Sequence, residues 1–201
     1  RQSAASRRSR RSILAGSDTA LGTGGITKGG SGTWTLGQNN SYTGLTTVNA
    51  GTLRISDNTV GNPASFTANQ VTLGGGTLTA TSNVSFVGGN VGFAVTGTTG
   101  GLGVEAGATL TISNDISGSG TLTKFGPGTL ALVGPNTFSG TLNLDSFINT
   151  GSDGAVLVTT SNALASVASP IYSRNNNGGT SILQLSGGVG IAQNFITSCR
   201  N

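Results

Sequence analysis

Histidine is absent from the 201 residues, and cysteine occurs once, as Cys199. Without histidine there can be no Ser-His-Asp triad, no Cys-His nucleophile pair and no histidine-ligated zinc. A single cysteine excludes an internal disulfide and any metal site built from several cysteines. We therefore expect no catalytic residue, no cofactor and no bound metal ion, and we expect Cys199 to be an inert thiol.

Charged residues are also scarce, at 8% of the chain, and the only glutamate is Glu105. Few residues favour helix, so a helix-rich domain is disfavoured. No apolar run approaches the ~18 residues needed to cross a bilayer as a helix, which predicts no membrane span. Among the acids, Asp145 and Asp153 lie closest in sequence to a possible pair. Each stands beside a turn, where aspartate usually caps its own backbone.

The net charge of +4 arises at the N-terminus, because five of the ten basic residues are Arg1, Arg7, Arg8, Arg10 and Arg11. Residues 12–201 carry five basic and six acidic groups. This nearly neutral body offers no broad basic face, which argues against a specific nucleic-acid partner. Residues 1–12 therefore form a basic arm with three open interpretations: a solvated arm, the remnant of a processed leader, or an arm that docks on an acidic surface or a neighbouring subunit.

Small and polar residues dominate what is present, since 107 of the 201 residues are Gly, Thr, Ser or Asn. Short segments that alternate apolar residues with Thr or Ser recur between Gly or Asn residues, which predicts β-strands separated by turns. These segments lie at 32–36, 45–48, 51–56, 70–80, 83–89, 108–113, 120–125, 128–133, 140–144, 155–160, 181–186 and 190–198.

An internal repeat connects residues 26–44 with residues 122–140, without gaps, at an offset of 96. Eight of the nineteen aligned positions are identical. Self-similarity at a fixed offset is typical of repeat architectures. The residues that we assign a structural role in this repeat are Gly32, Leu36, Asn40, Tyr42 and Gly44 in the first copy, and Gly128, Leu132, Asn136, Phe138 and Gly140 in the second.

A parallel β-solenoid is the fold that these features favour. One coil of short strands buries too little apolar surface to fold alone, and the next coil, stacked about 4.8 Å away, covers its inward face. We expect Asn40 and Asn136 to form amide ladders between coils, and Tyr42, Phe138 and Trp34 to pack in the core or at corners. An antiparallel sandwich is the rival fold. Lys28 and Lys124 occupy equivalent positions, and we expect both to be solvated rather than joined in an amide crosslink.

Residues 30–56 resemble the autotransporter-associated β-strand repeat of bacterial passenger domains, and residues 126–144 keep two of its three elements. The resemblance rests on Gly30 to Leu36, Asn40 to Gly44 and Thr46 to Leu53. It implies a right-handed β-solenoid stalk on the bacterial cell surface or outside the cell, with no chemistry of its own. We therefore expect an all-β protein with a basic arm over residues 1–12 and one β-solenoid domain over residues 13–201.

Three classes of function compete on this sequence. The first is an extracellular structural protein whose solenoids stack head to tail into a surface fibre or matrix filament, with the arm docked on a neighbouring subunit. The second is an adhesin passenger module that binds a carbohydrate or another surface, such as a cell-surface or matrix polysaccharide. The third, a polysaccharide-active enzyme, needs carboxylates that converge on one wall. Because the acids are few and scattered, we expect no enzyme.

Overall fold

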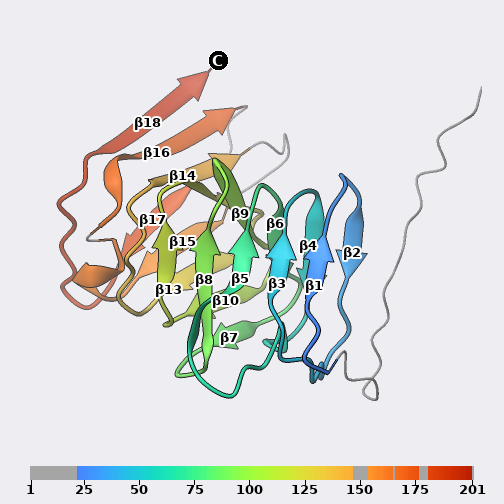
Figure 1. The fold of residues 1–201 in the computed structure, drawn as a ribbon. Coiled ribbons are helices and arrows are strands. Elements are labelled where there is room, and N and C mark those ends of the chain that lie inside the picture. Colours follow the sequence, from blue (N-terminus) through green and yellow to red (C-terminus); the bar gives the residue numbers. More distant parts are fainter. Residues whose placement is uncertain (1–21, 147–153, 165, 177–180, 201) are drawn as a thin grey trace, which may run out of the picture.

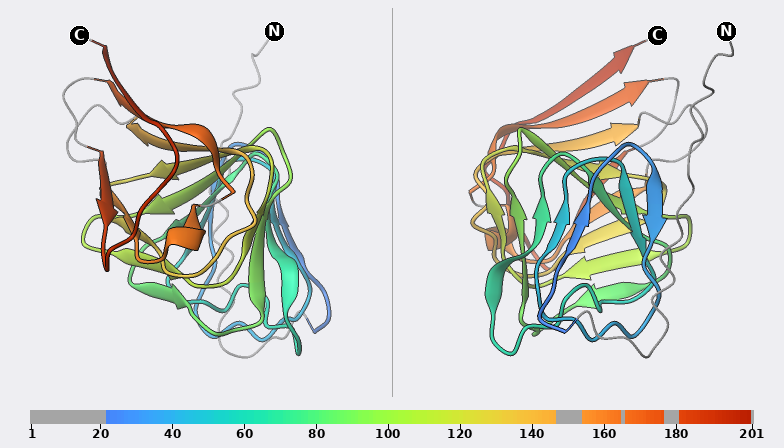
Figure 2. Two further views of the ribbon diagram at one scale, coloured as in Figure 1. Left: turned by 90° about the vertical axis from the view of Figure 1, so that its left-hand side faces the viewer. Right: turned by 45° about the vertical axis from the view of Figure 1, so that its right-hand side comes forward.

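The computed structural model describes residues 22–146, 154–164, 166–176 and 181–200. Three parallel β-sheets form the walls of a solenoid (Figures 1 and 2). The only helical element among the described residues is a single 3-10 turn, η1 (Ser161–Ala163). No described helix is long and apolar enough to cross a membrane.

Successive strands of the chain are distributed over the three sheets. Sheet I consists, in order, of β1 (Ile26–Lys28), β3 (Thr46–Val48), β5 (Thr67–Leu73), β8 (Val91–Val95) and β11 (Ile116–Gly118). Sheet II consists of β2 (Thr33–Thr35), β4 (Thr52–Ile55), β6 (Thr77–Ala80), β9 (Thr99–Val104), β12 (Thr121–Phe125), β14 (Thr141–Ser146), β16 (Ala168–Asn176) and β18 (Phe195–Arg200). Sheet III consists of β7 (Val84–Phe86), β10 (Thr109–Ile112), β13 (Thr129–Leu132), β15 (Ala155–Val158) and β17 (Ile182–Leu185).

Every strand pair in these sheets is parallel, and equivalent side chains stack from coil to coil. Leu53, Leu78 and Leu102, for example, lie in register and are at most 1% exposed. Alternation along each strand sends one residue inward and the next outward. The all-β parallel solenoid is therefore confirmed, and the antiparallel sandwich is wrong. Its right-handed sense stays a prediction, and the arm of residues 1–12 lies outside the described residues.

The sequence pattern did not predict some strands correctly, because glycine weakens the alternation of apolar and polar residues that marks a strand. Residues 70–80, which the pattern treats as one segment, are the two strands β5 and β6 separated by a glycine corner. Strands β8 and β9 contain Gly92, Gly100 and other glycines, and the pattern missed both. The neighbouring coils supply the hydrogen bonds that define these strands, which no local pattern records.

The two copies of the repeat lie on different walls. In the first copy β1 belongs to sheet I and β2 to sheet II, whereas in the second copy β12 belongs to sheet II and β13 to sheet III. Ile26 is in register, through four coils, with Ile116. The second copy begins at Leu122, six residues later and on the next wall. The repeat therefore specifies a strand, a corner and a second strand, but not the sheet that these strands join.

Candidate functional site

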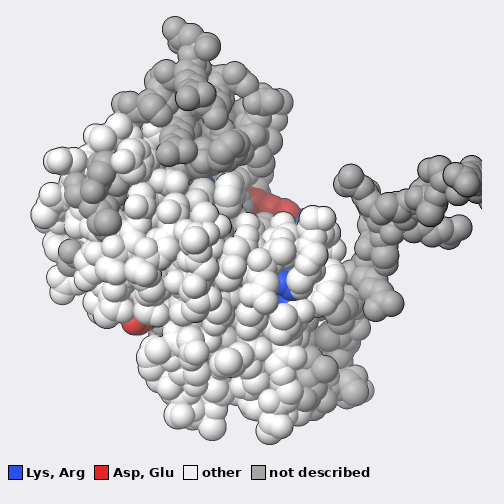
Figure 3. All heavy atoms as spheres, turned by 45° about the horizontal axis from the view of Figure 1, so that its top comes forward, with Lys and Arg blue, Asp and Glu red and all other residues white. Residues whose placement is uncertain are grey.

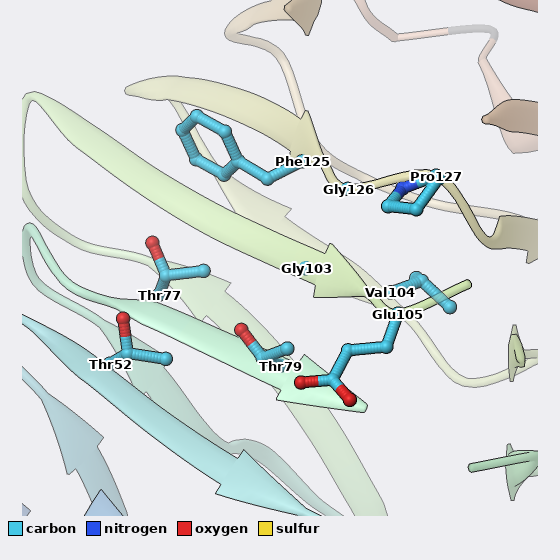
Figure 4. A pocket seen from close by; sticks show the side chains of 9 residues that line it. All are labelled: Thr52, Thr77, Thr79, Gly103, Val104, Glu105, Phe125, Gly126 and Pro127. Atoms are coloured by element: carbon cyan, nitrogen blue, oxygen red, sulfur yellow. The ribbon is translucent and has the colours of Figure 1, made fainter. Parts of the chain in front are cut away.

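A groove of about 380 Å³ crosses the outer face of sheet II. Strands β4, β6, β9 and β12 supply its walls (Figure 4). The residues that line it are Thr52, Thr77, Thr79, Gly103, Val104, Glu105, Phe125, Gly126 and Pro127. The groove therefore combines a threonine side, an apolar side formed by Phe125 and Pro127, and one carboxylate.

Glycines in β9 give this face its shape. Gly101 lies in register with Thr77, and Gly103 lies in register with Thr79 on one side and Phe125 on the other. A Cβ atom on Gly101 would lie 2.8 Å from Cε2 of Phe125 and would overlap the Thr77 hydroxyl. A Cβ atom on Gly103 would overlap the Thr79 hydroxyl. Side chains on the adjacent coils can therefore lean over the bare β9 backbone.

One ion pair stands at the end of this groove. Arg54 of β4 donates from Nη2 to Oε1 of Glu105, which follows β9. The two side chains are 39% and 41% exposed, so solvent screens their attraction. The Arg54 Nε–H is buried and has no hydrogen-bond partner. The face in Figure 3 shows few charged side chains over the described part of the surface, which matches the composition.

Two described aspartates stabilise the backbone of neighbouring segments. Asp57 Oδ2 accepts a hydrogen bond from the Asn39 backbone N–H at 2.7 Å, and Asp115 Oδ1 accepts one from the Thr137 backbone N–H at 2.7 Å. No group of three or more Cys, Asp and Glu residues that could hold a metal ion occurs in the described ranges. Asp145 lies within β14 rather than at a turn, and Asp153 falls outside the described residues.

The two lysines of the repeat are buried, so the expectation that they are solvated is wrong. Lys28 is 0% exposed and Lys124 is 2% exposed. Lys28 Nζ donates to the carbonyl oxygens of Gly29 at 2.9 Å, Gly30 at 2.7 Å and Ala50 at 2.9 Å. The last bond reaches the corner of the next coil. Burial lowers the pKa of the Lys28 amine from its usual 10.5.

Lys124 repeats this arrangement at another corner, where Nζ donates to the carbonyl oxygens of Phe125 at 3.1 Å and Gly126 at 2.5 Å. In both copies the second residue after lysine is a glycine with positive φ, 71° at Gly30 and 79° at Gly126. The left-handed turn directs carbonyl groups back to the amine, and glycine adopts it without penalty. The shared pattern Thr-Lys-x-Gly-x-Gly-Thr was the sequence signal for this corner.

The aromatic positions of the repeat lie in the core. Tyr42 is 1% exposed and Phe138 is 2% exposed, and Leu36 and Leu132 are buried with them. The Tyr42 hydroxyl is 2.6 Å from Oγ1 of Thr46. Burial raises the pKa of Tyr42 to about 12. Trp34 is half-buried against the core, with Lys28 Nζ 5.5 Å from its ring centroid.

The asparagines of the repeat do not form the expected amide ladder, because their side chains form hydrogen bonds with backbone groups and, at Asn40, with a threonine hydroxyl. Asn136 Oδ1 accepts from the Ile116 backbone N–H at 2.9 Å, and its Nδ2 donates to the Ala163 carbonyl at 2.9 Å. One amide therefore connects the coil below with the coil above. Asn40 Nδ2 donates to the Gly37 carbonyl at 2.5 Å and to Thr59 Oγ1 at 3.2 Å.

The repeat glycines lie where coils approach closely, with one exception. A Cβ atom on Gly44 would overlap Gly24, one on Gly140 would overlap Gly120, and one on Gly128 would overlap the Glu105 carbonyl. Gly32 has nothing within 4 Å of such an atom. The exception arises because Gly32 precedes β2, the outermost strand of sheet II.

The basic arm and Cys199, which the sequence analysis also singled out, lie where the structure describes no side chains. The arm residues Arg1, Arg7, Arg8, Arg10 and Arg11 lie outside the described part of the chain. Cys199 belongs to β18, but its side chain lies outside the described features.

Comparisons with known proteins agree with this geometry. The model of the family named passenger-associated-transport-repeat matches residues 26–55 and 122–146. The "Adhesin BmaC autotransporter" of Brucella suis biovar 1 (strain 1330) is 38% identical over 125 residues. That match covers 58% of this chain and 4% of the relative, so the chain corresponds to a small part of that protein. No solved structure matches the chain. Residues 26–55 and 122–146 therefore carry passenger-associated-transport repeats within a parallel β-solenoid, and the similarity of the chain to part of an autotransporter adhesin indicates the bacterial cell surface or the extracellular space.

Proposed function

We propose that this solenoid is a structural unit that stacks head to tail with other copies and so extends a surface fibre or matrix filament. The observation that supports this proposal is the stacking of apolar side chains from coil to coil, which continues through the last described strands, β17 and β18. Leu185 and Phe195 are in register with Val158 and Ile171, which are both 0% exposed, but are themselves 41% exposed. A further coil stacked on β17 and β18 would cover both side chains.

Such a contact joins two different ends of the solenoid. The first coil of one copy, with β1 and β2 at its edge, would pair with β17 and β18 of the next. A heterologous contact that does not close generates filaments. The backbone N–H and C=O groups of the two edge strands would then form parallel hydrogen bonds across the contact, as neighbouring strands do within one solenoid. The basic arm of residues 1–12 would add contacts along the neighbouring wall, each exposed ion pair giving only about 0–1 kcal/mol.

Sedimentation velocity over a concentration series, together with electron microscopy, tests the stacking. We expect the wild-type protein to form filaments, and Leu185→Asp to remain monomeric because a carboxylate would be buried between coils. Ile182→Asp is the matched control, since Ile182 lies on the same strand but pairs with the half-buried outward position of Ala155. A wild-type protein that stays monomeric at high concentration would contradict the proposal.

Deletion of residues 1–11 tests the arm separately. We expect the truncated protein to assemble more weakly while its circular dichroism keeps the β signal. Assembly equal to that of the full chain would show that stacking needs no arm.

A second candidate is an adhesin module, and the observation that favours it is the similarity of the chain to part of an autotransporter adhesin. Binding of the fluorescently labelled protein to a printed array of cell-surface and matrix polysaccharides tests this function. A denatured sample of the same protein is the control. Binding that is equal in both samples would reject a specific adhesin role.

A non-enzymatic role completes the proposal. Asp57 and Asp115 already accept backbone hydrogen bonds, and Glu105 pairs with Arg54. We expect no new reducing ends or unsaturated products when the protein is incubated with neutral and acidic polysaccharides. Turnover that Asp145→Ala or Asp153→Ala abolishes would contradict this.

A further inference from the structure

We propose that the groove on sheet II binds a neutral oligosaccharide chain, with Phe125 as its stacking surface and the hydroxyls of Thr77 and Thr79 as its hydrogen-bonding edge. This inference rests on the second candidate function, the adhesin module, and assigns it a site and a ligand class. It is independent of filament formation, which involves the ends of the solenoid.

The size and floor of the groove suit a ligand of this kind. Its volume of about 380 Å³ falls at the lower end of the range for small-molecule sites, about 300–1,000 Å³. Gly101 and Gly103 keep the floor at backbone level, so the side chains on both sides stand above it. Because β4, β6, β9 and β12 are hydrogen-bonded neighbours in one sheet, the walls hold fixed positions.

The two walls differ in chemistry. Phe125 and Pro127 form an apolar wall, and Thr52, Thr77 and Thr79 present hydroxyl groups from β4 and β6 (Figure 4). A sugar ring has an apolar C–H face and a rim of hydroxyl groups, so it complements both walls at once. Threonine hydroxyls can donate and accept, which suits a partner made of hydroxyl groups.

The charges of the groove select a neutral partner. Glu105 is the carboxylate at its end, and Arg54 pairs with it, so the site carries no net charge. An acidic polymer would face the Glu105 carboxylate, and a basic one would have to displace Arg54.

A purely structural explanation of Phe125 is that its ring covers the glycine backbone of β9. The two explanations make different predictions. If Phe125 only covers Gly101, its replacement lowers the stability of the protein and does not change saccharide binding. If Phe125 stacks on a sugar, a conservative replacement weakens binding in a protein that remains folded.

The experiment is a titration of the uniformly 15N-labelled full chain with cellohexaose, maltohexaose and chitohexaose, followed by amide chemical shifts. A hexamer of galacturonic acid serves as the acidic comparison. We expect at least one neutral hexasaccharide to shift amides of β6, β9 and β12, and the acidic hexamer to bind more weakly. Absence of shifts in these strands with all three neutral sugars would overturn the inference.

Three variants locate the site. Phe125→Leu keeps an apolar cover over β9 and should weaken binding by about twofold to tenfold, the scale of a lost aromatic contact. Thr79→Val keeps the shape and removes one hydroxyl, and should weaken binding by about threefold to tenfold. Thr35→Val is the control, because Thr35 lies on β2 of the same sheet, outside the groove lining.

The outcomes separate this inference from the function on which it rests. Saccharide binding that both groove variants, Phe125→Leu and Thr79→Val, leave unchanged would keep the adhesin function and reject the groove. Preference for the acidic hexamer would reject the neutral ligand. A wild-type chain that binds no polysaccharide on the array and shifts no groove amide would reject both. Thermal melts of each variant show that a loss of binding is not a loss of folding.

Discussion

Lys28 and Lys124 bring two of the few charged groups of the described chain into its interior. Their aliphatic stems pass through the core, and their amines end among the carbonyl groups of a corner. Lys28 also reaches Ala50 in the next coil, so it fastens one coil to the other. A buried amine needs such acceptors.

Lys28→Met should therefore destabilise the protein although methionine keeps most of the packing. The carbonyl groups of Gly29, Gly30 and Ala50 would lose their donor, and the loss of these partly buried hydrogen bonds should cost about 1–3 kcal/mol in the free energy of unfolding. Urea denaturation of wild type and variant measures this cost. Thr27→Ala on the same strand, where the side chain is exposed, is the control. A change of less than about 0.5 kcal/mol in Lys28→Met would contradict the role of the amine.

Tyr42 makes stability depend on alkaline pH. Its pKa is raised to about 12 in the folded protein from the ordinary 10.0, so the folded state favours the neutral phenol. The stability that this provides is complete below pH 10 and is lost as the pH rises from about 10 to about 12, when the unfolded chain ionises first. The full loss is about 3 kcal/mol for a shift of this size.

Tyr42→Phe should remove this part of the alkaline decline. Phe138 occupies the equivalent position of the second copy, which shows that an aromatic ring without a hydroxyl fits. At pH 7 the variant loses the hydrogen bond to Thr46, worth about 1 kcal/mol. The check is the difference in unfolding free energy between the two proteins at pH 8, 10 and 11.5. If that difference does not move in favour of the variant as the pH rises, the assignment to Tyr42 is wrong.

At the scale of the element, some glycines are required because neighbouring coils lie too close to them to leave room for a side chain. Gly140 precedes β14, and a Cβ atom there would overlap the Gly120 carbonyl and lie 2.8 Å from Cζ of Phe138. Its φ is not in the left-handed region, so the constraint is space rather than backbone conformation. The coil cannot move away without weakening the parallel pairing of β12 with β14.

Gly140→Ala should lower the free energy of unfolding by about 2 kcal/mol or more, in the range of overpacked sites. Gly29→Ala is a matched control, because nothing lies within 4 Å of its Cβ position and its φ is also ordinary. That variant should stay within about 0.5 kcal/mol of wild type. Thermal denaturation of the two variants compares them directly. Equal stability would show that the coil spacing adapts to a methyl group.

At the scale of the whole molecule, backbone hydrogen bonds and apolar stacking connect the described coils. The ion pair between Arg54 and Glu105, whose side chains are both described, is exposed. The amines of Lys28 and Lys124 donate to backbone carbonyl groups. Screening by salt acts mainly on exposed charges.

The midpoint of urea unfolding should therefore change little between about 20 and 200 mM NaCl, by less than the equivalent of about 1 kcal/mol. The double variant Arg54→Gln with Glu105→Gln should show the same midpoint within about 1 kcal/mol. A strong salt dependence that this double variant abolishes would assign the ion pair a larger role than its exposure allows.

The sequence was sufficient for the fold class. Alternation of apolar residues with Thr and Ser predicts strands, glycine and asparagine predict corners, and the offset of 96 predicts stacked coils. These features are local or repeat along the chain, so they can be read without coordinates. The same is true of the function classes that the lack of histidine excludes.

The groove was not predictable in the same way. Thr52, Thr79 and Phe125 come from strands far apart in the chain, and only the register of four coils brings them to one face. Nothing in the sequence around Gly103 indicates that this glycine lies on the floor of the groove rather than in a turn. The ion pair joins Arg54 to Glu105, which likewise meet through stacking rather than through spacing.

The sequence by itself therefore determined the parts of a coil, namely its strands and corners, and a repeat of these parts that can lie on any of the three sheets. Only the tertiary structure decided that the first copy lies on sheets I and II and the second on sheets II and III. It also decided that Lys28 and Lys124 are buried. The physical reason is that alternation fixes which residues share a face, whereas the neighbouring coil determines whether that face meets solvent, carbonyl groups or another side chain.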